Sequence, residues 1–322
     1  MVDRNSAIDS VKGTMIILVV FGHVIYKGNY YDLFQNIHDF VYIFHMPIFL
    51  MLSGYFFRCE LTVNWLKMVT SKLALPYFLS FSFYLVSLYY VGLWGGVETS
   101  NYVNNFQDVL QAIFVKPFAS YWYLHSLISF SLVFYVSNLI GEKLNLKIFT
   151  LPVILVLYSI FHYFLWQMNV KFFYWVAGYI WLGYAFHLFL KSYYKGVIDF
   201  ASLLVLTILF LLIITNNIAS YGLLRTLISL AILFVLLILF KHVNCNWLMF
   251  VGRNSILIFL FHVYFLNIAK FTSSIFLLFD NTGTLFVLFS LIFSVIGSLL
   301  IGLVMDKLHI SKYILGTSNA IK

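Results

Sequence analysis

The stretch GTLFVLFSLIFSVIGSLLIGLV, residues 283–304, has no charged side chain and is long enough to cross a bilayer as a helix. Similar stretches follow one another along the 322 residues, which are 63% hydrophobic and only 9% charged, with a mean hydropathy of +0.97. A soluble domain carries about 25% charged residues. A helix satisfies its own backbone hydrogen bonds where water is absent, so these runs predict membrane-spanning helices.

We predict an all-α, polytopic membrane protein with about ten transmembrane helices and both termini in the cytoplasm. The expected spans are 11–27, 36–57, 70–93, 120–140, 149–168, 171–190, 196–215, 219–240, 248–269 and 283–304. With the N-terminus inside, 14 of the 19 lysines and arginines fall on the cytoplasmic side and 5 on the other, the bias that sets orientation.

The net charge of +8 is spread over many short loops, as topology signals are, so we expect no nucleic-acid partner. Residues 1–322 are predicted to form a single transmembrane domain without an appended soluble domain. The expected location is the cell membrane (the inner or plasma membrane), with membrane lipids around the helices.

Histidines within spans are the first functional candidates, because ionisable groups are costly inside a bilayer. His23 lies eleven residues beyond Lys12, a rise of about 16 Å along a helix, in the outer half of the first span. His45 and His262 are expected at a similar depth, and His125 enters the fourth span from outside. Any one of them alone would as readily be a packing residue. Four on separate helices predict a polar chamber that opens outward.

A metal site is not expected at this cluster. Zinc sites usually draw two ligands from one short spacing, such as i and i+4 on a helix. No histidine pair here has that spacing, and we place no carboxylate at the same depth.

Basic residues gather at the cytoplasmic ends of four spans: Lys12, Arg58, Lys72 and Arg253. Each alone is explained as an anchor that follows the positive-inside rule. As a group they predict a binding site for a phosphate-bearing cytosolic donor. Asp9 lies three residues before Lys12 on the same helix face and is expected to position it.

These residues lie in short motifs spread over most of the chain. The motifs are, in order, Asp9-Ser10-Val11-Lys12-Gly13 with His23, Phe44-His45-Met46-Pro47-Ile48-Phe49, Ser53-Gly54-Tyr55, Lys72-Leu73-Ala74-Leu75-Pro76, Trp122-Tyr123-Leu124, and Gly252-Arg253-Asn254-Ser255 with His262. Together they resemble the signatures of the acyltransferase family 3 membrane proteins. The ten-span layout also agrees with that family.

The resemblance implies an enzyme that transfers an acyl group, usually acetyl, from acyl-coenzyme A to a hydroxyl of a surface or lipid-linked glycan such as an O-antigen, capsule or exopolysaccharide. It implies that His23 is catalytic and that the residue matching Lys12 handles the donor, acetyl-CoA. We expect His23, His45 and His262 as catalytic residues, and Lys12, Arg58, Lys72 and Arg253 as donor-binding residues. Lys12 and Lys72 stand where arginine is common in the family, and lysine lacks the bidentate fork for phosphate.

Two alternatives stay open at this point. His23 acts either as the general base on the sugar hydroxyl or as the carrier of the acetyl group. The chain could instead be a transporter or flippase for lipid-linked glycans, which predicts inverted repeats or broken helices near mid-membrane, and we see neither in the sequence. The sequence does not identify the acceptor, and an acyltransferase that acts on an amine or a lipid headgroup is a further alternative that only the product would distinguish.

Overall fold

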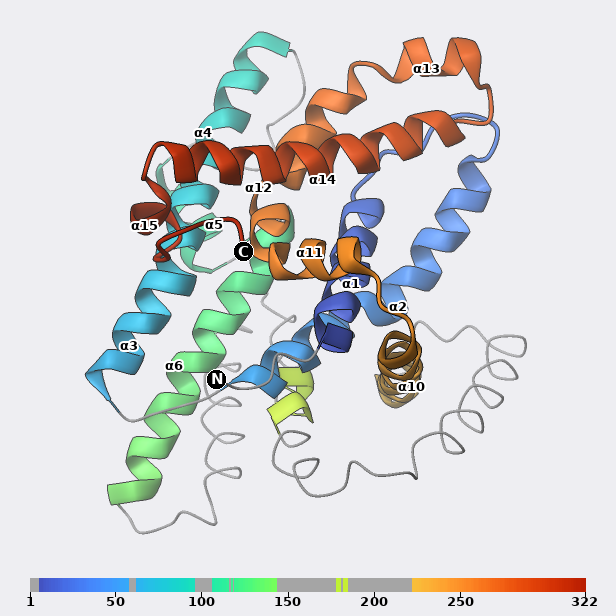
Figure 1. The fold of residues 1–322 in the computed structure, drawn as a ribbon. Coiled ribbons are helices and arrows are strands. Elements are labelled where there is room, and N and C mark those ends of the chain that lie inside the picture. The colour runs from blue at the N-terminus through green and yellow to red at the C-terminus, as the bar shows by residue number, and fades with distance from the viewer. Residues whose placement is uncertain are drawn as a thin grey trace. The chain divides into compact units, whose positions relative to one another are not determined.

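The computed structural model describes residues 6–57, 62–95, 106–115, 117, 119–143, 178–180, 182–184 and 222–322. Every regular element in these ranges is a helix (Figure 1), which confirms the all-α prediction for this part of the chain. Four helices are long and apolar enough to cross a membrane, or five if one bent pair counts as a span. The predicted spans 149–168, 171–190 and 196–215 fall largely outside the described residues, so the number ten and the cytoplasmic termini stay predictions.

The chain divides into two compact units, and each is described by itself. The first unit is made of Met1–Phe57, Tyr179–Leu303 and Ile321–Lys322, and the second of Arg58–Gly178 and Val304–Ala320. The principal helices of the first unit are α1 (Ser6–Gly22), α2 (Tyr31–Phe56), α10 (Gly222–His242), α11 (Asn246–Arg253), α12 (Ser255–Lys270) and α13 (Ser273–Phe279). α14 (Thr284–Lys307) begins in the first unit and ends in the second.

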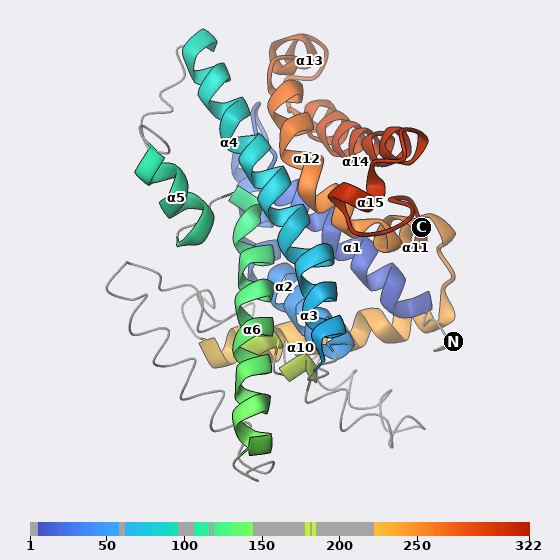
Figure 2. The same cartoon turned by 90° about the vertical axis from the view of Figure 1, so that its left-hand side faces the viewer.

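Helix α1 is the centre of the first unit, where it packs against α2, α10, α11 and α12. Figures 1 and 2 both show α11 beside it. The approach is closest at Gly13 and Gly252, because a Cβ on Gly252 would lie 1.8 Å from the carbonyl oxygen of Asp9. A side chain at either glycine would therefore push these two backbones apart.

The expected span 248–269 is not one straight helix. α11 and α12 meet at an angle of 82° on either side of Asn254. The fully buried Asn254 stabilises the break, since its amide nitrogen donates to the carbonyl oxygens of Phe250 and Lys322 and its amide oxygen accepts from the Lys322 backbone N–H. The hydropathy pattern had predicted a single straight helix here, because hydropathy averages over the break.

The second unit contains α3 (Val63–Val69), a π-helix (Thr70–Ala74), α4 (Leu75–Gly95), α5 (Phe106–Phe114), α6 (Trp122–Lys143) and α15 (Ser311–Ile314). Aromatic side chains hold it together: Tyr121 stacks on Phe81 with ring centroids 4.6 Å apart, and the Tyr77 hydroxyl donates to the carbonyl oxygen of Ile113. The predicted span 70–93 thus belongs to a longer run of helix that starts at Val63.

Candidate functional site

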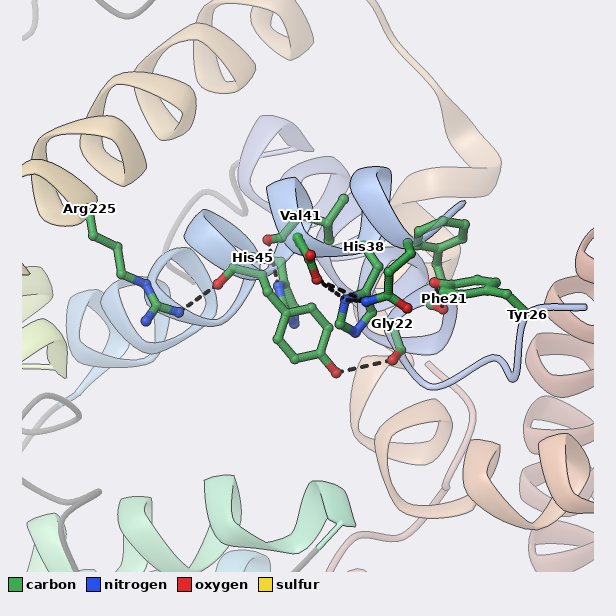
Figure 3. Close-up of polar contacts among 10 residues, drawn as sticks. Phe21, Gly22, Tyr26, His38, Val41, His45 and Arg225 are labelled. Carbon is green, nitrogen blue, oxygen red and sulfur yellow. Dashed lines mark hydrogen bonds and ion pairs between the residues drawn. The ribbon is translucent and has the colours of Figure 1, made fainter. Parts of the chain in front are cut away.

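Helix α1 ends at Gly22, so His23 lies just beyond the helix rather than inside it, as the predicted span 11–27 implied. The last carbonyls of a helix have no partner within it. Two tyrosine hydroxyls supply partners here: Tyr26 donates to the carbonyl oxygen of Phe21 at 2.8 Å, and Tyr42 of α2 donates to that of Gly22 at 3.1 Å (Figure 3). The end of α1 is therefore fixed on both sides of the half-buried His23.

His262 of α12 is the nearest ring partner of His23, with ring centroids 5.3 Å apart. It is fully buried, and its Nδ1 lies 2.8 Å and 3.0 Å from the carbonyl oxygens of Ile258 and Phe259. A carbonyl oxygen only accepts, so Nδ1 carries the proton and Nε2 carries a lone pair. That Nε2 is buried and has no hydrogen-bond partner within the described residues.

An unpartnered buried nitrogen costs a protein about 1–3 kcal/mol. Native structures contain few of them, and each one calls for an explanation in terms of function or an unseen ligand. The Nε2 of His262, next to the His23 ring, is therefore the feature of this unit that points most directly to chemistry.

His45 of α2 repeats the arrangement. Its Nδ1 lies 2.7 Å from the carbonyl oxygen of Val41, which makes Nδ1 the donor and leaves Nε2 as the acceptor. Its ring packs against that of Tyr42 at 4.7 Å, and it lies close enough to His23 for the two side chains to interact electrostatically. The structure thus brings together the three histidines that the sequence singled out on α2, α12 and at the end of α1.

The fourth histidine of the predicted cluster, His125, belongs to the second unit. Its Nε2 hydrogen-bonds to the carbonyl oxygen of Phe114 at 2.9 Å, so it too is held by a backbone carbonyl. That His125 lies near His23, His45 and His262 stays a prediction.

Arg225 of α10 was counted in the sequence only as a topology signal, and the structure gives it a specific contact. Pro47 lacks an N–H, so it cannot bond to the carbonyl of Ile43 one turn earlier on α2. Arg225 fills that place, because its Nε donates to the Ile43 oxygen at 2.9 Å and its Nη2 to the Tyr42 oxygen at 2.5 Å. Figure 3 shows the guanidinium reaching α2 beside His45. The arginine thus fixes the part of α2 that carries Tyr42 and His45.

His38 is a second residue that the sequence reasoning missed. Its ring lies 4.0 Å from that of Tyr42 and 6.1 Å from that of Tyr26, the two tyrosines that hold the end of α1. A signal was available, since His38, Tyr42 and His45 follow the i, i+4, i+7 spacing of one helix face.

Of the four basic residues that were predicted to bind the donor, the structure places Lys12 and Arg253 in the first unit. At the N-terminal end of α1, Arg253 donates from Nε to Oδ2 of Asp9 at 3.1 Å, and Lys12 lies over the Phe56 ring at 4.1 Å from its centroid. Asp9 is therefore bound to a partner from α11 that the sequence did not identify. Lys72 is exposed in the second unit, and Arg58 lies outside the described residues.

Within the residues that the structure places, no group of three or more His, Cys, Asp or Glu side chains is arranged to hold a metal ion. What the histidine cluster offers instead is ring nitrogens with lone pairs, which can accept protons or an acyl group.

Comparison with known proteins relates the chain to a family. Residues 5–303 match a family model described as an acyltransferase domain, of the acyltransferase 3 type. A stretch of 57 residues is 42% identical to the nodulation protein NolL of Sinorhizobium fredii, and it covers 16% of this chain and 16% of that protein. No solved structure matches the chain.

Proposed function

The chain belongs to the acyltransferase 3 family, and from this premise we propose that it is a membrane O-acetyltransferase. The donor is cytoplasmic acetyl-CoA, and the acceptor is a hydroxyl of a cell-surface or lipid-linked glycan, such as an O-antigen, capsule or exopolysaccharide. The protein lies in the plasma (inner) membrane with about ten spans and both termini in the cytoplasm.

The observation that carries this proposal is the pair of imidazoles at the end of α1. His23 is half-buried and 5.3 Å from His262, whose unprotonated Nε2 has no partner in the described structure. Burial of such a nitrogen lowers stability, and a reaction that moves protons or acyl groups between imidazoles explains its presence.

The donor end of the proposal rests on two cations towards the other end of α1: Arg253, which is paired with Asp9, and Lys12, which lies over the Phe56 ring. These cations are suited to the phosphates of coenzyme A, with Arg58 and Lys72 as further expected contacts. Along α1, Lys12 is about 16 Å from His23, a distance that the long flexible arm of coenzyme A is suited to bridge.

Two forms of the chemistry fit these residues. In the first, His23 removes the proton of the sugar hydroxyl while the hydroxyl oxygen attacks the thioester carbon, the C–S bond breaks, and the thiolate of coenzyme A leaves. In the second, a nitrogen of His23 attacks the thioester carbon, the thiolate leaves, and the acetyl group then passes to the sugar oxygen. In the second form Nε2 of His262 holds the proton that the acetylated ring loses and returns it afterwards.

The test is a reaction of purified protein in lipid nanodiscs with acetyl-CoA. Surface glycan extracted from a strain that lacks the gene serves as the acceptor, and the released thiol and the acetyl ester are measured. We expect His23→Ala to lower transfer by a factor of about 10³ or more, because it removes the reacting group. His242→Ala, at the exposed end of α10, is the matched control and should transfer normally. A His23→Ala protein that is folded and still acetylates the glycan excludes both forms.

A transporter or flippase is the second candidate, and one observation favours it: α11 and α12 form a helix broken at Asn254. Broken helices near mid-membrane are typical of transporter sites, whereas this break follows Arg253, which we expect at the cytoplasmic end of its span. The same nanodisc reaction distinguishes the two, since a transporter moves lipid-linked glycan without releasing coenzyme A from acetyl-CoA.

A further inference from the structure

The first turns of α2 carry a carboxylate–imidazole pair next to the histidine cluster. Nδ1 of His38 lies 2.8 Å from Oδ1 of Asp39, and Nε2 of Gln35 donates to the same oxygen at 3.0 Å. A carboxylate accepts, so Nδ1 of His38 is the protonated nitrogen and Nε2 carries the lone pair. Gln35 also lies 3.3 Å from Nδ1 of His38, but two donors cannot bond each other, so both point their hydrogens at Asp39.

The pair is more exposed than the buried histidines of the cluster around His23. The side chain of His38 is 22% exposed and that of Asp39 is 66% exposed, whereas His45 and His262 are buried. His38 is near enough to His23 for their charges to interact. Its ring is held between Tyr42 and Tyr26, whose hydroxyls bind the two residues before His23 (Figure 3). Within the described residues, Nε2 of His38 has no hydrogen-bond partner.

On the basis of the proposed function, we infer that His38, oriented by Asp39, is the base that accepts the proton of the acceptor hydroxyl. A histidine whose Nδ1–H is held by a carboxylate is fixed in the tautomer that a general base requires. Gln35 positions the carboxylate in turn. This role for His38 leaves His23 to carry the acetyl group, so the inference selects the second form of the chemistry.

The hydroxyl oxygen of the sugar attacks the carbonyl carbon of the acetyl group on His23, and the new C–O bond forms. The C–N bond to His23 breaks, and its electron pair returns to the ring nitrogen. The hydroxyl proton passes to Nε2 of His38, which releases it to the solution on the exposed side of the pair.

Two acceptors of different chemistry test this assignment. A sugar hydroxyl must lose a proton as it attacks, whereas the nitrogen of hydroxylamine attacks without prior deprotonation, so only the first needs a base. For His38→Gln in nanodiscs we expect acetyl transfer to surface glycan to fall by a factor of about 10² or more. Formation of acetohydroxamate from hydroxylamine should change only a few-fold. With donor alone, the acetyl group should still appear on His23 after acid quench and mass spectrometry.

Asp39→Asn should show the same selectivity for the glycan with a smaller loss, and Asp32→Asn, an exposed carboxylate earlier on α2, is the matched control. The inference is overturned if His38→Gln transfers to glycan at the wild-type rate, or if it loses transfer to both acceptors equally, as a structural defect would produce. Thermal unfolding of each variant identifies such a defect. Failure of the proposed function is distinct from these results, because the wild-type protein would then acetylate neither acceptor faster than the same mixture without protein.

Discussion

The two ends of α1 differ in how their polar groups are satisfied. At the N-terminal end, Asp9 and Arg253 form an ion pair, and the backbones of Gly13 and Gly252 are in direct contact. At the C-terminal end, aromatic and imidazole rings surround His23, and the buried Nε2 of His262 has no partner in the described structure. The N-terminal end is packed for stability, whereas the C-terminal end keeps the lone pair of the His262 Nε2 at a cost in stability. The difference suggests that chemistry belongs at the C-terminal end.

The largest effect should come from filling the glycine contact at the N-terminal end. A Cβ at Gly252 would lie 1.8 Å from a backbone oxygen of α1, which cannot rotate away as a side chain can. We expect Gly252→Ala to lower the free energy of unfolding by about 3 kcal/mol, the upper part of the usual range for overpacking. The measurement is thermal unfolding in detergent together with the yield of monodisperse protein.

Gly178→Ala is the matched control for this change, because a Cβ there meets nothing within 4 Å among the residues that the structure describes. It should leave the unfolding transition where it is. A Gly252→Ala protein as stable as the wild type would contradict the close packing of α1 against α11.

The second change separates function from stability at the other end of α1. His262→Phe keeps a ring of similar shape but removes the unpartnered nitrogen, so we expect stability to stay the same or rise by about 1 kcal/mol. Acetyl transfer should fall by a factor of about 10², because the nitrogen that holds a proton for His23 is gone. Unfolding and transfer are measured on the same preparation.

If His262→Phe lost stability without any loss of transfer, His262 would be a packing residue. The C-terminal end of α1 would then resemble the N-terminal end, where the contacts serve stability. The substitution His242→Phe, at the exposed end of α10, serves as the control for replacing a histidine by phenylalanine.

The smallest effect is expected at the turn that holds the segment after His23. Gly28 and Gly283 pack against each other there, and the backbone N–H of Asn29 and of Tyr30 bond to the turn before α14. The Thr282 hydroxyl and the Leu285 backbone N–H bond to Asp280 and hold the pKa of its carboxyl below the usual value. The stabilisation is therefore present above the ordinary pKa of aspartate and is lost as pH falls through the lower folded value.

Asp280→Asn should accordingly lower the unfolding temperature slightly near pH 7, and the difference from the wild type should shrink as the pH is lowered into the acid range. Unfolding temperatures measured across that range test this, with Asp32→Asn as the exposed control. A difference that grows towards acid pH would mean that the carboxylate does not stabilise this turn.

Much of the first unit could be predicted from residues close together in the chain. The helices α2, α10 and α14 follow their apolar runs within a few residues, since hydropathy is a local property. The clustering of His23, His45 and His262 was also predicted, because similar depth in a bilayer restricts where their side chains can meet. His38 was missed, although its spacing from His45 is visible in the sequence.

Other features depend on residues that are distant in the chain. The break at Asn254 is stabilised by the backbone of Lys322, and the proline-freed carbonyl of α2 is bound by Arg225. Neither partner can be identified from local hydropathy, which is why a straight span was expected at 248–269 and why Arg225 was counted only as a topology signal.

The sequence by itself determined the class of the protein, a chain of apolar helices. It also identified the ionisable side chains within these helices as functional candidates, because such groups are costly inside a bilayer. It also determined the family, through short motifs spread over most of its length. Only the tertiary structure decided which ring nitrogens hold a proton and which hold a lone pair. That choice depends on the carbonyl or carboxylate that each ring meets, and such contacts exist only after the helices have packed.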